Sequence, residues 1–150
     1  MKSILDTSTL NKSIKRVENI HKDVVPVWGK MNAAQMFQHL NKSIEFLFTD
    51  EKVKRMFVGR IIGKAILKKA LKEGVPITKN SPTAPNFVSN NSVNFEIEKD
   101  LFLKRLYQFS NFTEADFEGK IHPFFGKMTG NQWNILIYKH LDHHFKQFNQ

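Results

Sequence analysis

Apolar residues recur at helical spacing along most of the chain, and the first such segment covers about residues 8–20. Its repeat is carried by Leu10, Ile14, Val17 and Ile20. Apolar positions three and four residues apart fall on one face of an α-helix. The pattern therefore predicts an amphipathic helix. The stretch 21–31 that follows contains Pro26 and Gly29 and interrupts the repeat.

A second helix is predicted to begin at Asn32. Asn32 can cap the helix and Gln35 stands three residues later, which is the spacing of a capping box. The apolar stripe that follows consists of Ala33, Met36, Phe37, Leu40, Ile44 and Leu47. This stripe is the face that we expect to enter the core.

A third helix is predicted over about residues 52–73, ended by Gly74 and Pro76. Its apolar positions alternate with Lys and Arg: Val53, Phe57, Ile61, Ile62, Ala65, Ile66 and Leu71. A basic amphipathic helix can lie on an anionic membrane or bind nucleic acid. More often such a helix belongs to a bundle and turns its lysine face to solvent, and we favour that interpretation.

The rest of the chain is predicted to contain a long loop and two more helices. Residues 74–92 indicate a loop, because they combine three prolines with Ser and Asn and show little periodicity. A fourth helix is predicted over about 93–110 and an irregular segment after it. The inward side chains of the fourth helix are expected to be Phe95, Leu101, Phe102, Leu106 and Phe109. The last helix should begin at Thr129, which forms a second capping-box pattern with Gln132.

These elements predict an all-α fold in one domain over residues 1–150. No segment shows convincing strand alternation. The simplest arrangement is a bundle of four main helices plus one additional helix, with the long loop as a crossover connection. A chain of 150 residues, 41% hydrophobic and with 14 Phe, has the composition of a globular protein.

Charge and cysteine content narrow the chemistry. The chain has no Cys, so metal ligands must be His, Asp or Glu. The formal net charge of +9 is compatible with nucleic acid or anionic lipid as a partner. The motifs of RNA-binding sheets and zinc fingers are absent, so we favour neither partner. The start of the chain lacks an apolar signal region and no apolar run reaches the ~18 residues of a membrane span, so we expect a cytoplasmic location.

Histidines on the last predicted helix are the strongest candidate for chemistry. His140 and His144 stand four residues apart on the face that carries Trp133 and Leu141. Two buried imidazoles need partners, either other side chains in the core or a metal ion that both bind. His39 on the second helix is the best candidate for a third ligand, and His122 from a loop is the second candidate.

Other catalytic patterns fit the chain poorly. The stretch "HLDHH" lacks the glutamate that a zinc-protease helix carries directly after its first histidine. A di-iron bundle needs Glu-x-x-His on two helices, and only Glu18 and His21 have that spacing. There is no glycine-rich phosphate loop and no nucleophile-elbow serine.

Three stretches, "WGKMNAAQMFQHL", "HPFFGKMTG" and "YKHLDHHFKQF", resemble in order and spacing the DinB/YfiT-like superfamily of metalloenzymes. The likeness extends from about Trp28 to Phe148 and is closest to a branch of small bacterial proteins of unknown function. The resemblance implies a DinB-like four-helix bundle with His39, His140 and His144 as ligands of one metal ion. Relatives often end the last motif in His-Arg-Gly-Gln. Residues 144–147 keep its His and Gln but not the two between.

The resemblance implies a transferase, in some relatives thiol-dependent, or a hydrolase. Three histidine ligands leave a coordination position open for water or a thiol co-substrate. Zinc is the first expectation and nickel the second. Gln35, His143 and Gln147, and also His122, are candidates to orient the imidazoles, although His143 can equally be a solvated flank residue.

Partners and alternatives remain open from the sequence alone. We expect a small-molecule substrate, with a thiol co-substrate as one option, and a homodimer is an arrangement that such bundles adopt. The first alternative is a non-catalytic helical module whose histidines are structural. The second is a binder of anionic surfaces, nucleic acid or membrane, that uses the third helix.

Overall fold

Four of the long helices begin at polar residues whose side chains satisfy the first free backbone N–H groups. The computed structural model describes residues 1–49, 52–81 and 92–150. The side chain of each capping residue accepts a hydrogen bond from the backbone N–H three residues further along the chain. The caps are Asp6 for α1 (Thr7–Glu18), Asn32 for α2 (Ala33–Ile44), Asn94 for α4 (Phe95–Gln108) and Thr129 for α6 (Gly130–Gln147). The predicted capping boxes that Gln35 and Gln132 complete are confirmed.

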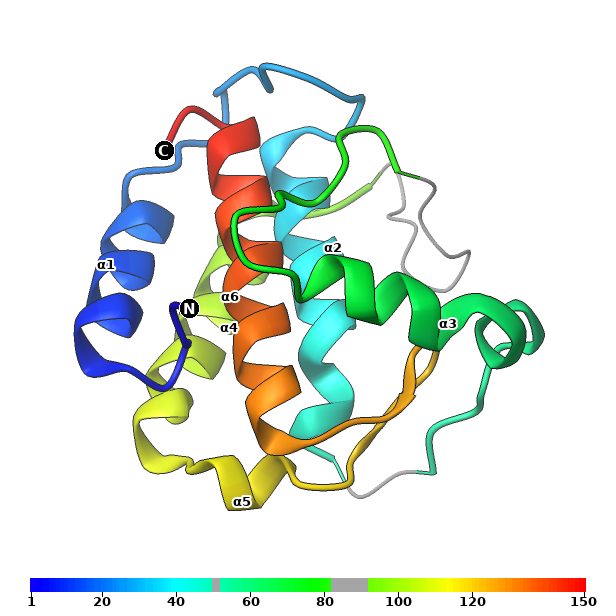
Figure 1. The fold of residues 1–150 in the computed structure, drawn as a ribbon. Helices are drawn as coiled ribbons and strands as arrows, with labels where there is room; N and C mark the ends of the chain where they lie inside the picture. The colour runs from blue at the N-terminus through cyan, green and yellow to red at the C-terminus, as the bar shows by residue number, and fades with distance from the viewer. Residues whose placement is uncertain (50–51, 82–91) are drawn as a thin grey trace.

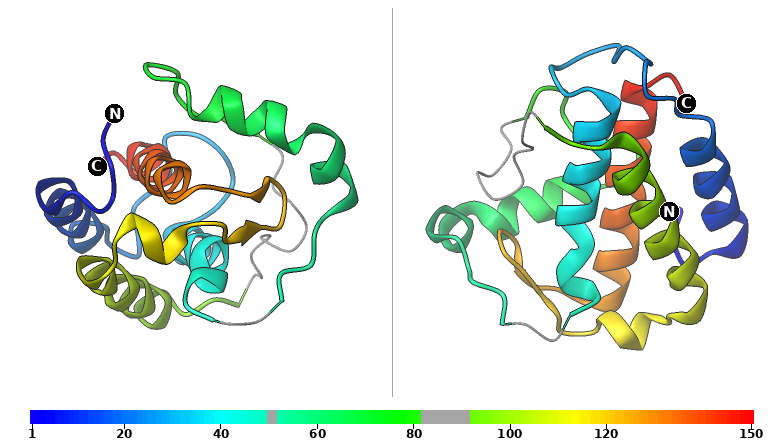
Figure 2. Two further views of the ribbon diagram at one scale, coloured as in Figure 1. Left: turned by 60° about the horizontal axis from the view of Figure 1, so that its bottom comes forward. Right: turned by 180° about the vertical axis from the view of Figure 1, so that it is seen from behind.

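The helices α1, α2, α4 and α6 lie side by side and form the bundle (Figures 1 and 2). α6 is in contact with both α1 and α2, and α4 with the same two helices. Buried apolar side chains from all four helices make up the core and include Val17, Phe37, Leu40, Phe102, Leu106, Trp133 and Phe145. The all-α class is thus confirmed.

Within the described ranges, no helix is both long and apolar enough to cross a membrane.

The third predicted helix, α3 (Phe57–Ala70), lies across the bundle at the rim of the molecule (Figure 1). It begins at Phe57 and not near residue 52. The expectation that it belongs to the bundle and buries its isoleucines is wrong. Its buried residues are Gly59, Gly63 and Leu67, because the two glycines let its backbone approach the main chain of Phe124.

The segment 111–130 is more ordered than the sequence predicted. It contains α5 (Glu114–Phe117) and an antiparallel hairpin of β1 (Ile121–His122) and β2 (Gly126–Lys127). The sequence pattern does not reveal this hairpin, because strands of two residues are too short to show alternation. Short 3-10 turns also follow α2 (Glu45–Leu47) and α4 (Phe109–Asn111).

Leu101, predicted to face inward on α4, is 38% exposed, because the buried face of α4 runs through Phe102 and Leu106. The greater part of the loop predicted over 74–92 falls on residues 82–91, outside the described residues.

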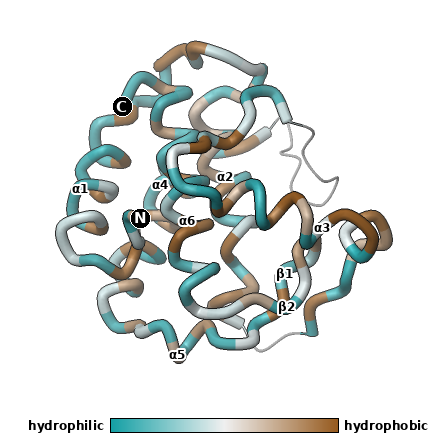
Figure 3. The backbone as a smooth tube through the Cα atoms, viewed as in Figure 1, coloured by the Kyte–Doolittle hydropathy of each residue, from teal (hydrophilic) through white to brown (hydrophobic). Residues whose placement is uncertain are grey.

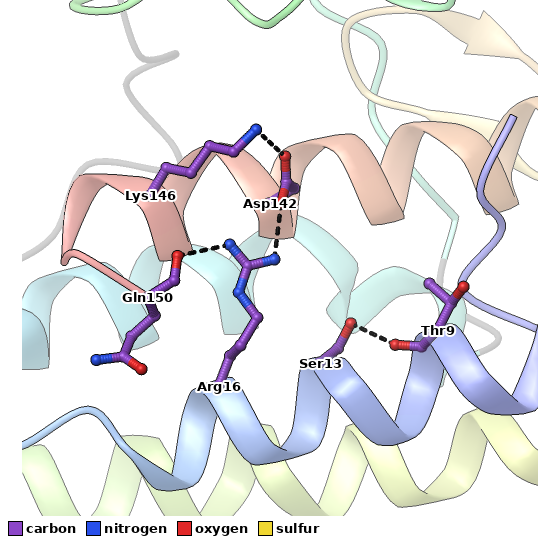
Figure 4. A network of polar contacts seen from close by, with 6 residues as sticks. All are labelled: Thr9, Ser13, Arg16, Asp142, Lys146 and Gln150. Carbon is purple, nitrogen blue, oxygen red and sulfur yellow. Dashed lines mark hydrogen bonds and ion pairs between the residues drawn. The ribbon is translucent and has the colours of Figure 1, made fainter.

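A polar network ties α1 to the second half of α6 (Figure 4). Arg16 donates to Asp142 at 2.7 Å and to the carbonyl oxygen of Gln150 at 2.8 Å. Lys146 forms an ion pair with the same carboxylate at 2.7 Å. Burial raises the pKa of Asp142, but hydrogen bonds from Lys146 and Arg16 outweigh it and leave that pKa below its usual value. The turn of α6 that carries His140 and His144 is therefore held from its far side.

Replacing Gly63 with alanine should destabilise the protein by about 2 kcal/mol. A Cβ at this position would overlap the carbonyl oxygen of Phe124, so α3 and the hairpin must separate. At an open helical position the same change stabilises by about 1 kcal/mol. Urea unfolding measures the sign, and Ala65→Gly on the exposed side of α3 is the matched control. Stabilisation by Gly63→Ala would contradict the packing described.

Candidate metal centre

Three histidines from two helices meet where the middle of α2 faces the second half of α6. His39 Nε2 lies 3.0 Å from His140 Nε2, which lies 3.1 Å from His144 Nε2. Each of the three offers one ring nitrogen, and these nitrogens lie within 4.8 Å of one another. His39 and His144 are buried, whereas His140 is partly exposed. The group is thus close enough to hold one metal ion and reaches the surface beside His140.

The tautomer of His144 follows from its neighbours. Gln147 donates its side-chain N–H to the carbonyl oxygen of Trp28 at 2.7 Å, so its Oε1 is the atom that lies 2.8 Å from His144 Nδ1. An amide oxygen can only accept. His144 must therefore carry its proton on Nδ1, which leaves the lone pair of Nε2 directed at the other two imidazoles.

The support behind His144 depends on close backbone approach at Gly29. This residue has a φ of +81°, and a Cβ added there would lie 2.7 Å from Nε2 of Gln147. Val27 also donates its N–H to the carbonyl oxygen of Gln147 at 2.7 Å. The segment around Trp28 is thus fastened to the last turn of α6, and a hydrogen bond to the far nitrogen of an imidazole is what orients a metal-ligating histidine.

His140 and His144 are held in the neutral form. Burial, with a smaller contribution from the neighbouring His39, lowers the pKa of His144 to about 3. Burial also puts the pKa of His140 well below its ordinary value, with His144 and His39 acting in the same direction. A metal ion needs neutral imidazole, so the environment that makes these side chains poor bases suits them as ligands.

Two of the three separations between the ring nitrogens also fit a metal ion. With Zn–N bonds of 2.0–2.1 Å in a tetrahedron, two ligand nitrogens stand about 3.3 Å apart. The two Nε2 separations of 3.0 and 3.1 Å differ from this by only a few tenths of an ångström. Hydrogen bonds among the three histidines satisfy their ring nitrogens only in part, because His140 Nε2 faces two ring nitrogens and can donate at most one proton.

The other residues singled out from the sequence occupy different places. Gln147 contacts His144 as described. His143 packs edge-on to Trp28 and to His144, with ring centroids 5.6 and 5.1 Å apart, and burial lowers its pKa. It is half-buried against the group and is not one of the three. Gln35 closes the capping box with Asn32, at the start of α2.

His122 lies outside the group of three and organises the hairpin. Its Nδ1 accepts from the backbone N–H groups of Phe124 and Phe125 at 3.0 and 3.2 Å. Its ring packs against Trp133 and Phe125. Burial lowers its pKa to about 3, with a smaller contribution from the charge of Arg55. These contacts give it a structural part in the turn that supports α3.

Sequence reasoning missed the part played by the backbone of residues 27–29. The signal was the pair Trp28–Gly29 in a segment without periodicity, since an isolated Gly there indicates a close approach of backbone. Trp28 acts here through its main chain. Its carbonyl oxygen is what fixes the amide of Gln147.

Comparison with known proteins places the chain in a family. Residues 1–150 match the family described as Protein of unknown function (DUF1569), and the chain belongs to it. Comparisons with curated proteins and with solved structures gave no match.

Proposed function

We propose that this member of the DUF1569 family is a metal-dependent enzyme, a transferase or hydrolase that acts on a small molecule. The observation that carries the proposal is the convergence of Nε2 atoms from His39, His140 and His144. A family of unknown function leaves the reaction open. The resemblance to the DinB/YfiT-like superfamily supports the same ligand set and the same order of ligands, one from an inner helix and two from the last.

Zinc, or as a second choice nickel, bound by the three imidazoles would supply a Lewis acid that lowers the pKa of a water or thiol. Three neutral ligands leave the full charge of a divalent cation uncompensated, which favours an anionic fourth ligand such as a thiolate. The exposed part of His140 indicates the side from which this ligand enters.

Trp28 is the residue that we assign to the bound small molecule. Its ring packs edge-on to His143. The Nζ atom of Lys79 lies 4.1 Å from the centroid of the Trp28 ring. Its indole Nε1 is buried and has no hydrogen-bond partner among the described residues. A buried donor without an acceptor is costly, so an oxygen of the substrate would gain a hydrogen bond here. Lys79 adds a positive charge on the same side.

Cobalt(II) loading of the untagged protein tests both the site and the thiol. Co²⁺ replaces Zn²⁺ in nitrogen sites, and its visible absorption reports the coordination number. We expect one equivalent of Co²⁺ with the spectrum of a four- or five-coordinate ion. Addition of a small thiol should then produce a near-ultraviolet sulfur-to-cobalt band, because the fourth position is open.

The control variant is His39→Ala, which removes the one ligand that α2 supplies and leaves the α6 pair in place. It should lose the visible spectrum together with the thiol band. Binding of Co²⁺ with no response to thiol would favour hydrolysis over thiol transfer. Failure of the wild type to bind about one equivalent of either Co²⁺ or Zn²⁺ would support the alternative of a helical module with structural histidines.

A further inference from the structure

α3 lies at the rim of the molecule, and hydrophobic residues occupy much of its length (Figure 3). Several of its large apolar side chains are exposed to solvent. The exposed fractions are 76% for Phe57, 53% for Val58, 71% for Ile61, 43% for Ile62 and 41% for Ile66. At 100° per residue these five positions fall on one half of the helix circumference. They form a continuous apolar face, defined here as the α3 face.

The outward direction of the α3 face is fixed by what lies behind it. Gly59, Gly63 and Leu67 are the buried residues of α3. The two glycines are in close approach to the main chain at Phe124, and Met56 donates its backbone N–H to Pro123. A rotation that buried the isoleucines would have to lift the helix from the hairpin. The packing of α3 on the hairpin therefore fixes this apolar face on the outside of the folded protein.

Only positive side chains accompany the α3 face. No Asp or Glu occurs from residue 52 to residue 72. The exposed basic residues of this stretch are Lys52, Lys54, Arg60, Lys64, Lys68, Lys69 and Lys72. Lysine and arginine beside a stripe of Phe and Ile are the composition of a helix that lies in the headgroup region of a membrane.

We propose that α3 docks the protein on an anionic lipid surface, with Phe57, Ile61 and Ile62 inserted between the headgroups. The helix has 14 residues and is about 21 Å long, shorter than the ~30 Å hydrocarbon core, so it lies along the surface. The proposal is independent of the metal centre. It also replaces the expectation of a bundle helix with a solvated lysine face, because the apolar side faces outward.

The positive charge of α3 favours an anionic lipid surface over two other partners, a second copy of the chain and nucleic acid. Two copies of the chain that met through the α3 face would bring their lysines together without an acidic residue of α3 to pair with them, which opposes dimerisation. Nucleic acid would be attracted by the lysines but gains nothing from exposed isoleucines. An anionic bilayer is the partner that uses both features of α3.

Cosedimentation of the full chain with lipid vesicles tests the proposal. We expect binding to vesicles of phosphatidylglycerol and phosphatidylcholine in equal parts and none to phosphatidylcholine alone. Lys64→Gln with Lys68→Gln should weaken binding by about 25-fold, at roughly fivefold per charge. Ile61→Asn with Ile62→Asn keeps every charge and should weaken it at least tenfold.

Matched variants separate the α3 face from general basicity. Lys12→Gln with Lys15→Gln removes the same charge from exposed positions on α1, and Ile97→Asn replaces an isoleucine of α4 that is 65% exposed. Both should bind vesicles like the wild type, and circular dichroism should show all variants folded. Three results would overturn the proposal: absence of binding to the anionic vesicles, equal loss in the matched variants, or a dimer in light scattering that Ile61→Asn with Ile62→Asn dissolves.

Discussion

Replacing His140 with alanine should raise the dissociation constant for Zn²⁺ at least 100-fold. His140 Nε2 is the atom that lies within 3.1 Å of ring nitrogens on both other histidines, so the variant leaves His39 and His144 without their common neighbour. Loss of a group that only orients a ligand already costs 10–100-fold in affinity, and loss of a ligand itself costs more. Competition with a chromophoric chelator measures the constant directly.

The neighbouring His143 provides the control for His140→Ala. His143 is on the same turn of α6 and touches His144 edge-on, but it is not one of the three converging histidines. His143→Ala should therefore change the affinity for Zn²⁺ far less than His140→Ala does. Equal affinities for the wild type and His140→Ala would contradict the assignment of His140 as a ligand.

The same variant separates a metal site from structural histidines. In the metal-free protein, His140→Ala removes a desolvated imidazole that faces two others, so stability should change by less than about 1 kcal/mol. Structural histidines would give the opposite pair of results, with a clear loss of stability and an unchanged metal content. Urea unfolding and metal analysis on the same samples distinguish the two.

The metal-free protein should lose stability steeply in acid. Burial lowers the pKa of both His122 and His144 from 6.5 to about 3. As the pH falls below 6.5, the unfolded chain takes up protons at these two positions while the native state does not. Stability is therefore full above pH 6.5 and is lost as the pH falls towards 3, by about 1.4 kcal/mol per pH unit for each histidine.

Urea unfolding at a series of pH values measures this slope. Two histidines give about 3 kcal/mol per pH unit, enough to unfold a domain of ordinary stability within a few units. His122→Asn keeps an acceptor for the turn but does not titrate, so its slope should be smaller by about 1.4 kcal/mol per unit. A wild-type stability that stays flat between about pH 6.5 and about pH 4 would show that the native state protonates these histidines readily.

Local patterns predicted the helix starts and the histidine pair. Asn32 with Gln35 and Thr129 with Gln132 marked the first turns of α2 and α6 correctly, because capping is decided within three residues. His140 and His144 were placed together by helical spacing alone. That His39 would meet them required α2 to face α6, which the apolar stripes of the two helices favoured.

The orientation of α3 could not be read from its own residues. Ile61, Ile62 and Ile66 recur at helical spacing, so a hydrophobic pattern assigns them to the core. Gly59 and Gly63 instead determine the packing, since only a side without side chains fits against the hairpin. The bond between Gln147 and Trp28 spans 119 positions, and no local pattern specifies such a contact.

Hydrogen bonds join Trp28 to Gln147 and Gln147 to His144. The conformation of the loop before α2 and the affinity of the protein for a cation are therefore thermodynamically coupled. If that loop rearranges, the side-chain amide of Gln147 is free to rotate. The ring proton of His144 can then move from Nδ1 to Nε2, and the affinity for the cation falls. By the same linkage, cation binding must restrain the loop. Hydrogen exchange at the N–H of Val27, which bonds to Gln147, would thus act as a built-in reporter of occupancy some distance from the ligands.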